Sequence, residues 1–241
     1  MPTLKEIGLY PQYIPSEEIF KQLAGKSEEE RNKITVDDYN LNYKEKFFEF
    51  RLQTRCVAAH YERSFNEYKN NKCWKIVIDC VLNVNREPYS VDGIYSVQVK
   101  CNIEDFFILG DFEKKRNTLD LITKGVSQIE QKEGWDKKVF DNAYNKVLAE
   151  NYENRWIWKK QKSNPGRQYI AKVLCEHGLY SCDISLIIED KQGQVIKQEI
   201  VIREKPDEWA FSKYFGDLNW ISNNEVRLVS KKKDYEFKLN L

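Results

Sequence analysis

Hydrophobic residues recur at two different periods along this chain, and the switch between them most constrains the fold. In segments such as Tyr95 to Val99, apolar and polar residues alternate, which is the pattern of a half-buried strand. Between residues 112 and 150 the spacing becomes three or four, as in Leu119, Ile122 and Val126, which defines one face of a helix. The sequence therefore predicts an α+β protein, mainly antiparallel sheet with a central helical pair packed on one face.

The segment before residue 46 is predicted to be helical and then irregular. Ser16 is suited to cap a helix that stops at Gly25. Ser27 and Glu30 match the capping box of a second short helix. We expect this N-terminal arm either to pack on the body of the protein or to project towards a partner.

Alternation predicts strands at 46–58, 74–84 and 95–101, which we interpret as an antiparallel meander. After the helical pair, further alternating segments are separated by turn signals such as Asn164-Pro165-Gly166. A hinge near residue 110 would divide the chain into residues 1–110, the arm with the meander, and 111–241, the helical pair with the later strands. One continuous domain is the alternative.

Charge and hydropathy narrow the range of partners. The chain of 241 residues has 39 basic and 38 acidic side chains, so no pervasive basic surface attracts nucleic acid or a membrane. It contains no run near the ~18 apolar residues that span a bilayer. Because Met1 is followed by no apolar leader segment, we expect a cytoplasmic protein.

The six cysteines and two histidines form no metal-binding signature. Cys56 and His60 are four apart in a segment predicted as strand, and no CxxC or HExxH occurs. Cys175 and Cys182 would oppose each other across a hairpin if Gly178 and Leu179 formed its turn. A cross-strand disulfide is one interpretation, and two reduced thiols on an apolar face are the favoured one.

Catalytic and cofactor motifs are also missing. Cys175 and His177 share a strand face but lack the third, orienting group of a nucleophilic site. The phosphate-binding patterns GxGxxG and GxxxxGK[ST] and the nucleophile pattern GxSxG do not occur. We therefore expect no catalytic residue, no cofactor and no metal, with a hydrolase that uses scattered carboxylates as the alternative.

One aromatic segment is a candidate binding surface. Trp156 and Trp158 lie on the same face of a predicted strand, between Arg155 and Lys159. Tryptophan and arginine are preferred anchors of protein interfaces, so these four residues are our candidate protein-binding site. The competing interpretation is a tryptophan pair in the core that covers the helices.

The segment from Phe215 to Leu228 resembles the endings of small bacterial immunity proteins from toxin–immunity systems, in its W-I-S-x-x-x-V-x-L strand entry. The resemblance implies a cytoplasmic protein that binds and blocks a cognate toxin domain. It assigns no binding residues, because immunity families share no common binding motif. The resulting hypothesis is a non-catalytic protein-binding module, most specifically an immunity-type inhibitor. An unrecognised hydrolase and an interaction subunit of a larger assembly are the alternatives.

Overall fold

A computed structural model describes residues 1–65 and 67–241, which form two compact units. Unit 1 is Met1–Tyr152 and unit 2 is Glu153–Leu241. Helices and strands are both abundant, and the chain has the expected α+β fold.

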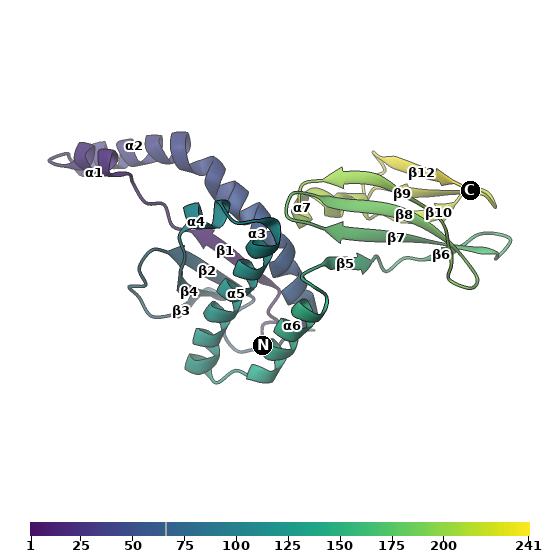
Figure 1. The fold of residues 1–241 in the computed structure, drawn as a ribbon, viewed down its shortest axis with the longest axis horizontal. Coiled ribbons are helices and arrows are strands. Elements are labelled where there is room, and N and C mark those ends of the chain that lie inside the picture. The colour runs from purple at the N-terminus through teal and green to yellow at the C-terminus, as the bar shows by residue number, and fades with distance from the viewer. Residues whose placement is uncertain (66) are drawn as a thin grey trace. The chain divides into compact units, whose positions relative to one another are not determined.

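Unit 1 contains a mixed four-stranded sheet in the order β1-β2-β4-β3 (Figure 1). Both β1 and β4 run parallel to β2, and β3 is antiparallel to β4. A two-residue turn at Asp92 and Gly93, with φ of 50° and 77°, joins β3 to β4, as expected for a hairpin with two left-handed positions. The strand bounds are β1 Glu6–Pro11, β2 Lys75–Val81, β3 Tyr89–Val91 and β4 Ile94–Lys100.

The helices of unit 1 divide into an arm and a packed layer. The arm contains α1, α2 and a π-helical segment, and the packed layer contains α3 to α6. Their bounds are α1 Glu17–Leu23, α2 Glu28–Asp38, the π-helical segment Tyr39–Tyr43, α3 Lys44–Ser64, α4 Ile103–Phe107, α5 Asp111–Glu133 and α6 Lys137–Ala149.

Of the predicted helical pair, α5 lies directly on the sheet. Gly125 of α5 faces Ile78 of β2 and Val97 of β4, at distances that leave room for no side chain. The other member, α6, packs on α3 and α5, and α3 also covers β1. The helices are confirmed, but only one of the two contacts the strands.

Two predictions for unit 1 are wrong. Residues 46–58 are part of helix α3, whose buried side chains include Phe50, Thr54 and Val57 at spacings of three and four. The three predicted strands do not form an antiparallel meander, because one is this helix and the other two are parallel. Alternation shows which side chains are buried but does not fix the direction of the neighbouring strand.

The boundary between the units follows the helical pair. It lies after Tyr152, whereas the hinge was expected near residue 110. The reason is that α5 and α6 bury their apolar faces against α3 and the first sheet. The tyrosine ring contacts Phe112 of α5 at 5.3 Å between ring centroids, which holds the end of unit 1 in place.

Unit 2 is built from two sheets that share one core. A five-stranded sheet has the order β5-β7-β8-β9 with β6 also paired to β7, and a three-stranded sheet has the order β10-β11-β12. Leu186 and Ile184 of the first sheet and Leu228 and Val226 of the second are buried in the same cluster. The bounds are β5 Asn154–Ile157, β6 Lys162–Ser163, β7 Tyr169–His177, β8 Cys182–Asp190, β9 Val195–Glu204, α7 Glu208–Phe211, a 3₁₀ turn Ser212–Tyr214, β10 Asp217–Trp220, β11 Glu225–Val229 and β12 Glu236–Asn240.

The hairpin between β7 and β8 has a longer loop than predicted. His177 pairs with Cys182, and Cys175 pairs with Ile184, so the two cysteines are not directly opposed. Residues 178–181 form the loop in place of a two-residue turn. Both cysteines are buried in the core cluster of unit 2, and no disulfide joins them.

The edge strand β9 carries features that oppose further strand pairing. Its register with β8 shifts twice, between Ile184 and Ser185 and between Ile188 and Glu189. Lys197 of β9 pairs with Ile188, whose side chain belongs to the core cluster, so a charge lies on the core-facing side of the edge. Bulges and inward charges protect the edges of natural sheets.

Candidate functional site

The N-terminal arm, residues 12–43, is the part of unit 1 that the core does not use. None of its residues is buried. Figure 1 shows α1 and α2 beyond the sheet, while the same helical path continues through the π-helical segment into α3. From Phe50 onward α3 buries one face against unit 1. The arm therefore projects, as one of the two sequence-based alternatives predicted.

Local hydrogen bonds form the arm. The side chain of Ser16 caps α1 by accepting from the Ile19 N–H at 3.3 Å. Ser27 and Glu30 form the predicted capping box, each side chain accepting from the other residue's backbone N–H. Caps satisfy the otherwise unpaired donors of the first turn, so these short helices have a local cause that does not require burial.

Large apolar side chains on the arm face solvent. Leu41 is 82% exposed, Phe20 58% and Val36 55%. These side chains lie on α1, α2 and the π-helical segment, so apolar area is exposed along the whole arm, and large exposed apolar area marks interaction surfaces. Acidic side chains surround them in excess over basic ones: Glu17, Glu18, Glu28, Glu29, Glu30, Asp37 and Asp38 against Lys21, Lys26, Arg31 and Lys33.

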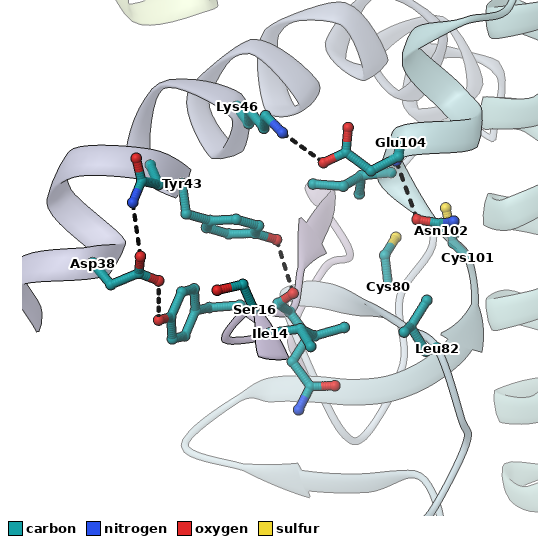
Figure 2. A pocket seen from close by; sticks show the side chains of 14 residues that line it. Ile14, Ser16, Asp38, Tyr43, Lys46, Cys80, Leu82, Cys101, Asn102 and Glu104 are labelled. Atoms are coloured by element: carbon teal, nitrogen blue, oxygen red, sulfur yellow. Dashed lines mark hydrogen bonds and ion pairs between the residues drawn. The ribbon is translucent and has the colours of Figure 1, made fainter. Parts of the chain in front are cut away.

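A pocket of about 380 Å³ lies where the arm meets the sheet (Figure 2). Its sheet side is formed where the parallel strands end: Gln12 follows β1, Leu82 follows β2, and Asn102 follows β4. In α/β folds, ligands bind in the crevice beyond the carboxyl ends of parallel strands. The arm contributes the opposite wall.

Hydrogen bonds around Asp38 fix the arm side of the pocket. The Tyr13 hydroxyl donates to one carboxylate oxygen at 2.5 Å, and Asn42 donates to the other at 2.8 Å. Burial, together with this bond and the carboxylate charge, raises the pKa of Tyr13 to about 12. The phenol therefore remains a donor at neutral pH, and Asp38 is an acceptor with no cationic partner among the described residues.

Two further contacts lie around the pocket, one within the arm and one between α3 and α4. The Tyr43 hydroxyl donates to the Gln12 carbonyl at 2.8 Å, and Lys46 pairs with Glu104 at 2.7 Å. Tyr43 belongs to the π-helical segment, a rare conformation that occurs frequently at functional sites. Burial is the main reason that the pKa of Tyr43 lies above its ordinary value.

Two cysteines line the sheet side of the same pocket, as Figure 2 shows. Cys80 is on β2 and is 2% exposed, and Cys101 follows the last residue of β4 and is half-buried. The interaction between the two neighbouring thiols raises the pKa of Cys80 well above its ordinary value and lowers the pKa of Cys101. This pair supplies the soft, nucleophilic group of the pocket.

The sequence-predicted binding residues lie in unit 2. Trp156 packs 6.2 Å from Phe211 between ring centroids, and Trp158 stacks on Phe215 at 5.5 Å. Both tryptophans are half-buried against the core cluster, so they contribute to packing there. The flanking cations lie at the surface, where Arg155 pairs with Glu176 at 3.0 Å and Lys159 is exposed.

The other candidate residues have structural partners. His177 donates from Nε2 to the Pro206 carbonyl at 3.1 Å and accepts from Asn154 at Nδ1, so both ring nitrogens are engaged. His60 contacts Glu150. Across residues 1–65 and 67–241, no group of three or more His, Cys, Asp or Glu side chains is arranged to hold a metal ion.

Sequence reasoning missed the pocket for an identifiable reason. The segment Glu6–Pro11 was not recognised as a strand, so Gln12 and Tyr13 had no place at a sheet edge. Ile7 and Leu9, flanking Gly8, carried the alternation that would have indicated β1. The ends of β2 and β4 were predicted, but antiparallel strands would have put Cys80 and Cys101 at opposite ends of the sheet.

Comparison of the chain with protein-family models, with curated proteins and with solved structures gives no match. Within the part of the chain that the structure describes, no helix has both the length and the hydrophobicity needed to cross a bilayer.

Proposed function

We propose that this chain is a protein-binding module and that the N-terminal arm is its contact element. The observation that supports this function best is the exposure of Phe20, Val36 and Leu41 on helices without a buried residue. Burying such side chains against a partner removes apolar area from water at about 25 cal/mol per Å². These three side chains gain little of this stabilisation within their own unit, because each is more than half exposed.

The chemistry of the arm indicates the kind of partner. Its apolar residues are interspersed with an excess of carboxylates, including Glu28, Glu29 and Asp37. A complementary surface is a hydrophobic groove with a basic rim, because opposite potentials steer association and suppress wrong partners. A toxin domain that is neutralised by an immunity-type inhibitor is the specific partner we propose, in keeping with the resemblance of residues 215–228.

Site-specific photo-crosslinking tests the proposal. A photoreactive phenylalanine analogue replaces Phe20 or Leu41 in the intact chain, produced in its own host cell, and the same analogue replaces Ile221 of unit 2 as a control. We expect one crosslinked protein from the arm positions and none from the control position. Equal crosslinking from Ile221, or none from the arm, contradicts the assignment of the arm.

Affinity measurements with the purified partner complete the test. Phe20→Ser and Leu41→Ser should each weaken binding at least about fivefold, since truncated anchors cost about 1 kcal/mol or more. Glu28→Lys should slow association, and the effect should shrink at high salt. Ile221→Ser is the matched control, because Ile221 is also exposed. A toxin partner should lose its activity at an equimolar ratio. If the partner keeps its activity, protein binding is supported but the role as an inhibitor is contradicted.

A second function is favoured by the location of the pocket at the carboxyl ends of β1, β2 and β4. We propose that the pocket binds a small organic ammonium ion, because Asp38 offers an acceptor charge beside the Tyr13 and Tyr43 rings. Calorimetry with benzylamine, and with benzyl alcohol as the uncharged control, tests this. Asp38→Asn should abolish binding of the amine, and equal binding of the alcohol would exclude charge recognition.

A further inference from the structure

Cys80 and Cys101 are brought together by the parallel pairing of β2 and β4. The register sets Val81 beside Lys100, and the Cys101 N–H donates to the Val81 carbonyl at 2.8 Å. Cys80 pairs with Val99, so Cys80 and Cys101 lie on the same face of the two strands, two positions apart along them. Both side chains line the pocket in Figure 2.

The two thiols differ in access and in ionisation. Cys80 is buried, whereas Cys101 is half-buried and lines a second cavity of about 390 Å³ as well. The neighbouring Cys80 thiol lowers the pKa of Cys101, and the charge of Lys124 acts in the same direction against burial and Asp105. The thiolate is the reactive form of cysteine, so Cys101 is the nucleophile of the pair.

The remaining cysteines provide internal controls. Cys56, Cys73, Cys175 and Cys182 are each at most 1% exposed. Burial raises the pKa of Cys56 to about 12 and the pKa of Cys73 to about 11. Neither feature favours reaction with an oxidant from solution.

We propose that Cys101 and Cys80 form a dithiol–disulfide pair in which Cys101 reacts first with a hydroperoxide and Cys80 resolves the product. The Cys101 thiolate attacks the terminal peroxide oxygen, the O–O bond breaks, and the leaving alkoxide or hydroxide takes up a proton. Cys101 becomes a sulfenic acid. The Cys80 sulfur then displaces water, forming the S–S bond, so one peroxide is reduced and two thiols are oxidised.

The environment of Cys80 changes in the direction that this second step requires. The leading cause of its raised pKa is its interaction with the negatively charged Cys101 thiolate. Oxidation of Cys101 to a neutral sulfenic acid removes that negative charge, so the resolving thiol ionises more readily. Cys101 lies just beyond β4, so its backbone is not paired to a strand on the side away from β2. This leaves the backbone room to move into disulfide geometry.

A disulfide here would alter the pocket directly. Cys101 precedes Asn102, which caps α4, and Glu104 of that helix pairs with Lys46 of α3. Oxidation at Cys101 would therefore act next to α4 and its ion pair with Lys46 of α3. The proposal does not depend on the protein-binding function, and its test uses the full chain alone.

The experiment is peptide mapping after treatment with one equivalent of hydrogen peroxide at pH 7.5. Free thiols are alkylated, the protein is digested without reductant, and the peptides are identified by mass spectrometry. We expect a Cys80–Cys101 crosslink that dithiothreitol reverses, with the other four cysteines alkylated. Before oxidation, Cys101 should react with iodoacetamide at least about tenfold faster than any of those four.

Two variants assign the roles. Cys80→Ser should accumulate a dimedone-reactive sulfenic acid at Cys101, and Cys101→Ser should leave Cys80 reduced. Circular dichroism and thermal unfolding check that both variants fold, and the wild-type alkylation rates need no variant at all. The proposal is overturned if no Cys80–Cys101 crosslink forms and Cys101 reacts with iodoacetamide no faster than Cys73 does. It is also overturned if oxidation of the wild-type protein stops at Cys101 without forming the disulfide.

Discussion

His60 Nε2 lies 2.6 Å from Glu150 Oε2, so a buried histidine near the end of α3 is bonded to the residue that ends α6. This contact fastens the end of α6 to α3 within unit 1. Burial of His60 outweighs the attraction of the carboxylate, and the pKa of His60 lies below its ordinary value. The neutral imidazole is thus the form that suits the fold.

This pKa predicts a loss of stability in mild acid. As the pH falls below the ordinary histidine pKa of about 6.5, the unfolded chain binds a proton at this residue before the folded chain does, so the free energy of unfolding decreases. Urea unfolding between pH 8 and pH 5 measures the effect. His60→Gln should flatten this part of the profile, and Glu150→Gln should steepen it, because the carboxylate favours protonation. An unchanged slope in His60→Gln contradicts the prediction.

Substitutions in β5 and just after it separate packing from binding. Trp156→Ala and Trp158→Ala should each lower the stability of unit 2 by about 2 kcal/mol, less than the ~3–5 kcal/mol of a fully buried aromatic residue. Arg155→Ala and Lys159→Ala should change it by less than about 0.5 kcal/mol, as is usual at exposed positions. Chemical unfolding followed by tryptophan fluorescence and circular dichroism measures these values. If neither tryptophan substitution changes the free energy of unfolding, the packing role is contradicted and a role in binding is favoured.

Close contact between α5 and the sheet makes Gly125 intolerant of a larger side chain. A Cβ there would lie 3.1 Å from Ile78 and 3.3 Å from Val97. Gly125→Val should therefore destabilise unit 1 by about 1–3 kcal/mol through overpacking. Lys124→Val, at an exposed position of the same helix, is the matched control and should cost less than about 1 kcal/mol of helix propensity. Equal costs for the two variants would show that the contact has no effect.

Gly216 makes a closer approach still, in this case to backbone. A Cβ at this residue would lie 2.4 Å from the Ser230 carbonyl carbon and oxygen, which cannot rotate away. Gly216→Ala should destabilise unit 2 by about 3 kcal/mol or more. Gly193→Ala, with φ of +83° and no atom in the way, should cost only the ~1–2 kcal/mol of a left-handed residue. Thermal unfolding compares them, and a smaller effect at Gly216 would contradict the steric argument.

The strands of unit 2 and the helices α5 and α6 could be predicted from the sequence, because each buries one regular face. It was less informative for α3, where Phe48, Phe50 and Leu52 alternate by chance along a helix whose buried face uses Phe50 and Val57. A local pattern shows which side chains of a segment are buried. Whether the segment forms a strand or a helix depends on the surface against which it packs.

The pocket was beyond the same reasoning. Its walls come from residues 12–16, 38–46, 80–82 and 101–104, which only the parallel arrangement of β1, β2 and β4 assembles. Parallel pairing leaves no turn signal between the paired strands, unlike the antiparallel pair β3 and β4, which the two-residue turn at Asp92 and Gly93 joins. The capping residues Ser16 and Ser27, by contrast, act within one turn and were predicted correctly.

The pairing of β1 with β2 also has a consequence for biosynthesis. A ribosome makes Ile7 and Leu9 early, yet their neighbours Ile76 and Ile78 on β2 are made only after the whole of α3. Until then the first strand has no hydrogen-bonding partner, and its apolar side chains remain in water. The nascent chain therefore passes through a stage at which it is a natural client for a chaperone, and that stage ends when β2 emerges.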